Sequence, residues 1–153
     1  MKITMRIHAL CFILGIILSA TSIRAEEERL WQLHAVDIQA PYASAPMANG
    51  CIGILPQKEP FAVEHVMLNH VFDAASPHVV SRVMRGINPF CLSMKIDNKK
   101  VDTSNISDWQ QTIDMRRAVH QTSFHTLEKA DVSYELCALR NLPYASLIRV
   151  TVQ

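Results

Sequence analysis

The sequence has little net charge, and this shortage excludes two classes of partner. Its 153 residues hold 15 lysines and arginines against 14 aspartates and glutamates, a formal net charge of +1. Residues 1–25 contain three of the basic residues and none of the acidic ones, so residues 26–153 have a formal charge of −2. Domains that bind nucleic acid or anionic lipid carry clustered positive charge. We therefore expect no nucleic acid partner and, once residues 1–25 are removed, no membrane partner.

The sequence also lacks a Cys-x-x-Cys pair. Apart from Cys11, its cysteines are Cys51, Cys91 and Cys137. Zinc sites and dithiol redox centres use closely spaced cysteines, so we expect no metal and no cofactor. The three residues are best explained as small, buried apolar side chains. An oxidising compartment would also permit one disulfide among them, and the sequence does not indicate which pair would form it.

Residues 1–25 have the layout of a secretory signal peptide. Lys2 and Arg6 give a basic start, residues 7–18 form an apolar run, and small residues follow, with cleavage expected after Ala25 or Ala20. The apolar run is short for a bilayer span. A buried N-terminal helix or an uncleaved anchor are the alternatives. We expect residues 26–153 to be the mature domain, secreted or periplasmic.

Short stretches of alternating apolar and polar residues organise the rest of the chain. The central stretch runs from Trp109 to Phe124, and its first half reads as a half-buried strand. Residues 119–126, rich in β-branched and aromatic residues, should run back beside it after a reversal at 114–118. The side expected to face the core is Trp109, Gln111, Ile113 and Met115.

Further alternation predicts more strands. The strongest pattern is Phe90–Asp97, followed by a reversal at 97–100. Other strands are expected at 51–55, as two segments within 61–73, at 132–138 and at 148–152. Residues 30–38 suit a strand or a helix, and residues 74–88 resemble a loop. No segment after residue 50 keeps a helical period, so we predict an all-β fold, an antiparallel β-sandwich.

The last strand pattern, residues 146–153, has no turn, charged gatekeeper or capping helix after it. Such a strand either pairs with something later or presents an open edge. We expect the sandwich to be incomplete and the chain to be the front part of a larger protein.

Four motifs in order resemble one family. They are Asn49-Gly50-x-Ile52-Gly53, Val71-Phe72-Asp73, Leu92-x-Met94-x-Ile96-Asp97 and Trp109-x-x-x-Ile113-Asp114-Met115-Arg116-x-Ala118. Together they are similar to the N-terminal domain of glycoside hydrolase family 65, over about residues 31–153. That family contains phosphorylases and hydrolases of α-linked glucosides such as maltose, trehalose and kojibiose.

The resemblance implies a supersandwich related in outline to mutarotase-like proteins, which precedes a catalytic (α/α)6 barrel. The catalytic groups of the family belong to that barrel, so no catalytic residue is carried over to this chain. Two departures concern the first motif. Cys51 stands where an aromatic residue is usual, and Leu55-Pro56 replaces a more polar continuation.

The residues themselves nominate no catalytic site. Glycoside hydrolysis generally needs two carboxyl groups across a sugar, and no pair is singled out among Glu59, Glu64, Asp73, Asp114 and Glu135. His65 and His70 are five residues apart, a spacing that suits neither one strand face nor one helix face for a metal. Asp114 lies at a turn beside Arg116 and Arg117, and it is better explained by a structural ion pair or by a hydrogen bond within its turn.

Three arginines are the candidate substrate-binding residues. Arg116, Arg117 and Arg140 fall in expected reversals, where they could contact a sugar, a phosphate or the barrel; solvated loop charge is the alternative. Trp109 and Tyr134 could stack on sugar rings but lie on the apolar side of their strands, which favours the core.

Three functions follow from these patterns. The first is a non-catalytic N-terminal domain of a secreted family 65-like enzyme, inactive alone, which packs on the barrel and helps to shape the substrate entrance or a homodimer contact. The second is a stand-alone carbohydrate-binding module. The third, a mutarotase-like enzyme, needs a histidine and a carboxylate that converge in a cleft, and no motif nominates them.

Overall fold

The computed structural model describes residues 29–73, 82–90, 92–127 and 129–153. Leu33–Gln153 forms one compact unit, which contains the core and nearly every strand residue. The expected signal peptide, residues 1–25, and Cys91 lie outside the described residues. No helix among the described residues is long and apolar enough to cross a membrane.

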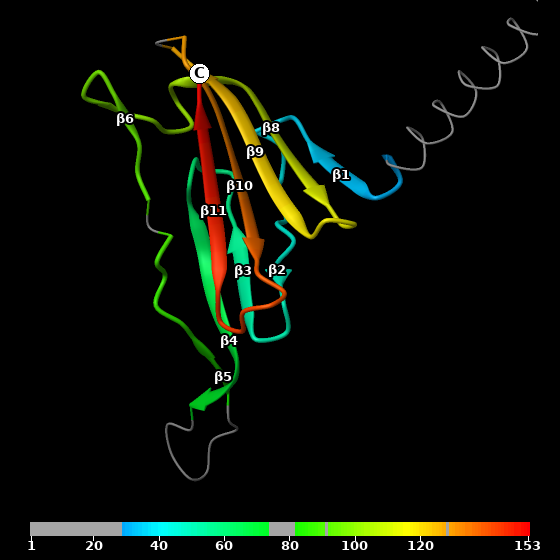
Figure 1. Cartoon of the computed structure of the whole chain (residues 1–153). Helices are drawn as coiled ribbons and strands as arrows, with labels where there is room; N and C mark the ends of the chain where they lie inside the picture. The colour runs from blue at the N-terminus through cyan, green and yellow to red at the C-terminus, as the bar shows by residue number, and fades with distance from the viewer. Residues whose placement is uncertain (1–28, 74–81, 91, 128) are drawn as a thin grey trace, which may run out of the picture. The chain divides into compact units, whose positions relative to one another are not determined.

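Two main antiparallel sheets make up the fold (Figure 1). The five-stranded sheet, called sheet A, has the order β1-β8-β9-β10-β11, and the four-stranded sheet B has the order β2-β3-β4-β5. Sheet A consists of β1 (Gln32–Ala35), β8 (Ile106–Asp114), β9 (Val119–Thr126), β10 (Asp131–Ala138) and β11 (Ser146–Val152). Sheet B consists of β2 (Met47–Ala48), β3 (Ile52–Pro56), β4 (Val63–Asp73) and β5 (Arg82–Arg85). A separate small hairpin pairs β6 (Lys95–Ile96) with β7 (Lys99–Lys100).

The core forms where one face of sheet A packs on sheet B. Because side chains alternate along a strand, β9 and β10 bury every second residue. The buried apolar cluster draws on both sheets: Ile52, Ile54, Val63 and Val66 from sheet B, and Trp109, Phe124, Val132, Tyr134, Leu136 and Ala138 from sheet A. This arrangement confirms the predicted all-β, antiparallel class and is consistent with a sandwich.

The turn between β3 and β4 is strained and contacts sheet A through Phe61. Phe61 has a positive φ of 61°, which is costly for a residue with a large side chain. It follows Pro60 in a turn that is closed by the Ala62 N–H, which donates to the Glu59 carbonyl at 3.0 Å. The Phe61 ring stacks on Tyr134 at 4.6 Å, and its N–H donates to the Tyr134 hydroxyl at 3.0 Å. Contacts with sheet A therefore stabilise this turn of sheet B.

Gln111 supplies a satisfied polar link inside the core. Its Oε1 accepts a hydrogen bond from the Tyr42 hydroxyl at 2.5 Å, and its Nε2 donates to the Gln57 carbonyl at 2.9 Å and to Thr122 Oγ1 at 3.1 Å. A buried amide is tolerated when its donors and acceptors are paired, as those of Gln111 are.

The central sequence prediction is confirmed. The strands β8 and β9 reverse at residues 115–118, Trp109 and Gln111 are buried, and the Arg117 N–H donates to Asp114 Oδ1 at 2.9 Å, as expected for a turn hydrogen bond. Met115, expected on the core side, lies in the reversal and is exposed.

The prediction of a long strand over Phe90–Asp97 is wrong. Among its described residues only Lys95–Ile96 is a strand. The cause is local: the Phe90 N–H donates to Asn88 Oδ1, and the Leu92 N–H donates to the Phe90 carbonyl, so the backbone turns instead of pairing. Phe90, Met94 and Ile96 still reach the core, and the following reversal is confirmed, with positive φ at Asp97 and Asn98.

Two other expectations are revised, and one alternative that the sequence left open is resolved. Residues 82–85, expected to be loop, form β5, which pairs with β4. The two strand segments expected within 61–73 are one eleven-residue strand, whose register shifts between Leu68 and Phe72, where His70 has a positive φ. The ambiguous stretch 30–38 contains the strand β1.

Candidate functional site

The three candidate arginines lie at one end of sheet A. Arg116 and Arg117 are in the β8–β9 reversal, and Arg140 is in the β10–β11 connection. Because Leu136 pairs with His120, the end of β10 lies beside the start of β9, which places both connections at the same end (Figure 1). All three side chains are exposed. We call these residues the arginine end; their role in substrate binding stays a prediction.

The Asn-Gly motif packs against the same end. Asn49 Oδ1 accepts hydrogen bonds from the Cys51 and Ile52 N–H groups, each at 2.9 Å. Its Nδ2 donates to the carbonyl of Leu139 at 2.7 Å, and Gly50 supplies the positive φ of 92° that the turn requires. The motif therefore has a structural task, because it joins sheet B to the β10–β11 connection.

The outer face of sheet A is polar over four strands. Of the residues that alternate with the core residues, Val119, Cys137 and Leu147 near the arginine end are apolar. The polar ones form what we call the polar face: Gln110, Gln121, Ser123, His125, Asp131, Ser133, Glu135, Arg149 and Thr151. Cross-strand pairing brings Ser123 opposite Ser133 and Glu135 opposite Arg149. Sequence alternation separated the polar from the apolar side of the stretches at 109–116, 132–138 and 147–152, whereas the register that pairs these strands could not be read from it.

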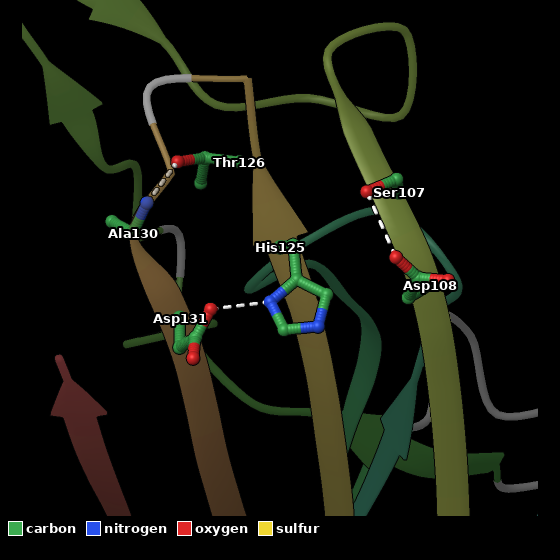
Figure 2. Close-up of polar contacts among 6 residues, drawn as sticks. All are labelled: Ser107, Asp108, His125, Thr126, Ala130 and Asp131. Carbon is green, nitrogen blue, oxygen red and sulfur yellow. Dashed lines mark hydrogen bonds and ion pairs between the residues drawn. The ribbon is translucent and has the colours of Figure 1, made fainter.

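A hollow of about 330 Å3 lies at one end of the polar face. Figure 2 shows His125 on β9 directed toward Asp131 on β10, with a hydrogen bond between His125 Nδ1 and Asp131 Oδ1. Ser107 donates to Asp108 Oδ2 at 3.1 Å on the neighbouring strand. Asp108 has a positive φ of 51° and sits where the β8–β9 register shifts, so a bulge brings its side chain into the hollow.

A second hollow of about 190 Å3 continues along the same face. It shares Ser133 and Thr151 with the first and is lined also by Gln121, Glu135 and Arg149, the last two joined as an ion pair. Together the hollows offer hydroxyl, amide, carboxylate and guanidinium groups. Such a set suits hydrogen bonds to a neutral, hydroxyl-rich ligand.

A buried histidine faces the opposite layer. His120, at 1% exposure, has no hydrogen-bond partner for its ring nitrogens among the described residues, apart from its own main chain. Burial lowers its pKa to about 4, while its own backbone carbonyl acts weakly in the other direction. His120 is therefore neutral at pH 7, and a charge on it would be costly.

The described residues provide little for metal or thiol chemistry. No group of three histidine, cysteine or acidic residues could hold a metal within the described ranges. Cys51 and Cys137 are free and only half-buried, whereas buried side chains were expected. Trp109 and Tyr134 lie in the core, as predicted, and are not available to stack on a sugar.

Comparison with known proteins gives a partial match. A kojibiose hydrolase of Mucilaginibacter mallensis is 29% identical over 140 residues, which are 92% of this chain and 21% of that protein. A kojibiose hydrolase of Flavobacterium johnsoniae is 32% identical over 111 residues, 72% of this chain and 16% of that protein. No family model matches. The chain thus spans about a fifth of the length of the curated relatives it matches, and these are members of glycoside hydrolase family 65.

Proposed function

We propose, from this partial similarity to glycoside hydrolase family 65, that the chain is the non-catalytic N-terminal β domain of a family 65-like enzyme that acts on α-glucosides. The observation that carries the proposal is the mismatch of coverage: nearly the whole chain matches, but about four fifths of each relative lies outside the match. The chemistry would then reside in a catalytic (α/α)6 barrel outside this chain.

The described residues support a structural role. The exposed arginine end could contact the barrel or the substrate entrance. At the hollow of the polar face the Ser107 hydroxyl donates to the Asp108 carboxylate, and His125 bonds to Asp131 and not to that serine. These contacts do not form the hydrogen bond from a nucleophile to a base that covalent catalysis uses. We infer that the domain shapes and stabilises the enzyme instead of performing the reaction.

A segment exchange tests this role. The 111 matched residues of the Flavobacterium johnsoniae enzyme would be replaced by their counterparts from this chain, and hydrolysis of kojibiose would be measured. We expect activity to be retained, while Arg116→Ala, Arg117→Ala and Arg140→Ala together lower kcat/KM. The matched control is Arg82→Ala with Arg85→Ala, on exposed β5 of the other sheet.

The isolated chain gives the complementary test. Purified chain would be incubated with kojibiose, maltose and trehalose, with and without phosphate. We expect no turnover. Turnover above background by this chain alone would overturn the non-catalytic assignment.

Secretion is a separate part of the proposal. Residues 1–25 would direct the protein out of the cytoplasm, so that it is secreted or periplasmic, and would be removed by cleavage after Ala25 or Ala20. Mass spectrometry of the N-terminus of the exported protein checks this. An uncleaved N-terminus on cytoplasmic protein would contradict it.

A second candidate, a carbohydrate-binding module, is favoured by the polar face and its hollows. Titration calorimetry with α-glucosides would detect binding that His125→Ala together with Asp131→Ala weakens. A folded chain that shows no heat of binding at millimolar sugar would dispose of this candidate.

A further inference from the structure

The strand β11 offers a row of unpaired main-chain groups. Asp131 and Gln153 exchange both of their N–H···O=C bonds, each at 2.9 Å. In an antiparallel ladder such pairs alternate, so Thr151, Arg149 and Leu147 also bond to β10. The N–H and C=O groups between them point away from β10, and no second strand of the described residues pairs with them (Figure 1): Ser146, Ile148, Val150 and Val152.

The side chains of this row point toward the core layer yet remain open to solvent. Val150 and Val152 lie opposite Tyr134 and Val132, which are both 2% exposed. Val150 itself is 40% exposed, and Val152 is 52% exposed. Tyr134 and Val132 of β10 are therefore buried, whereas the valines opposite them on the neighbouring β11 are exposed, although both strands have the same apolar pattern.

Exposed edges in natural sheets usually carry features that prevent pairing, such as lysine, proline or a bulge. β11 contains no lysine or proline, and its register with β10 has no shift. Its one charged residue, Arg149, points to the polar face, where it pairs with Glu135. Nothing on the strand itself therefore opposes a neighbour.

We propose that β11 is a docking edge for one further strand of the same enzyme, apolar at alternate positions, which pairs with Ile148, Val150 and Val152 and covers their side chains. The proposal rests on the proposed function, because the occupant belongs to the four fifths of the relatives that this chain does not match. Pairing would satisfy the main-chain row, and the alternate apolar residues would extend the core by one strand.

The test adds such a strand to the full chain. A flexible Gly-Ser linker after Gln153 would carry a seven-residue strand with apolar residues at alternate positions. The control carries the same residues with the apolar ones in a single run, so that no register places them all on one face. Amide hydrogen exchange is read at Ile148 and Val150, with Arg149 and Thr151 as internal references that already bond to β10.

We expect exchange at Ile148 and Val150 to slow at least tenfold with the alternating strand, with little change for the control or at the reference amides. Val150→Pro in the extended chain should remove the gain without unfolding the protein, because its N–H makes no bond to β10. Equal exchange with the two added strands would overturn the proposal.

Two results on the unextended chain would also overturn it. If protection of the Ile148 and Val150 amides rises with protein concentration and sedimentation shows a discrete dimer, the strand that pairs with β11 belongs to a second copy of the chain. Concentration-independent protection in a monomer would mean that the chain covers its own edge. Neither result bears on the segment exchange, so failure of the docking edge is distinct from failure of the proposed function.

Discussion

The neighbouring strands β10 and β11 have the same alternation and different surroundings. Every second residue of β10 is buried beneath sheet B, whereas the equivalent residues of β11 are half-buried or exposed. Periodicity in the sequence therefore tells which way a side chain points, and not whether another layer lies there. The closed strand β10 and the open strand β11 give matched positions at which this distinction can be measured.

The largest expected effect comes from protonating His120, a buried residue of β9 next to the closed strand β10. His120 lies opposite Leu136 of β10, and its pKa is lowered from 6.5 to about 4. Below pH 6.5 the unfolded chain binds a proton that the folded protein does not, so stability falls as pH falls and levels off below about 4. The loss amounts to about 3 kcal/mol. Urea unfolding between about pH 7.5 and pH 4 measures it.

The variant His120→Leu isolates this effect. Its pH dependence should be smaller by about 3 kcal/mol than that of the parent, while stability at pH 7 is kept, because the replaced nitrogens lack partners. The control is His125→Leu on the exposed polar face. An unchanged acid dependence in His120→Leu would assign the effect to other groups.

A cross-strand pair of valines gives the next largest difference. Val132 and Val152 face each other, at 2% and 52% exposure. Val132→Ala should cost about 2 kcal/mol, since two methyl groups are lost and a cavity remains, whereas Val152→Ala should cost under about 0.5 kcal/mol. Urea unfolding of both variants decides the matter; equal costs would show that β11 is covered after all.

These valines also show how far the sequence leads. Alternation put both valines on the apolar side of their strands and predicted most of β8, β10 and β11, while the β-branched and aromatic content of residues 119–126 predicted β9. The reversals that carry the arginines were also expected. Alternation failed at Phe90–Asp97, where the Phe90 N–H donates to the Asn88 side chain and the Leu92 N–H to the Phe90 carbonyl, and these local bonds override an alternating pattern. The His125–Asp131 contact and the bulge at Asp108 depend on register, which a single sequence does not fix.

The hydrogen bonds that hold the β10–β11 connection should contribute a smaller amount to stability, and Asn49 makes them. Asn49→Ala removes the acceptor for two N–H groups and the donor to Leu139, so we expect a loss of about 1–2 kcal/mol. The control is Asn141→Ala, an exposed asparagine in the β10–β11 connection to which Asn49 bonds. Thermal unfolding of both variants tests whether the family-like motif serves the fold; a stable Asn49→Ala variant would make that motif a candidate for ligand binding instead.

The smallest effect is expected where the two strands are alike, on the polar face. Glu135 and Arg149 form an ion pair across β10 and β11, and the arginine side chain is 65% exposed. Water screens such a pair, so a double-mutant cycle with Glu135→Ala and Arg149→Ala should give a coupling of about 0.5 kcal/mol, which salt at about 1 M removes. A coupling above about 2 kcal/mol would mean that this face is desolvated. In that case the polar face, and not only the edge of β11, would be covered in solution, and the contrast between a closed and an open strand would have to be redrawn.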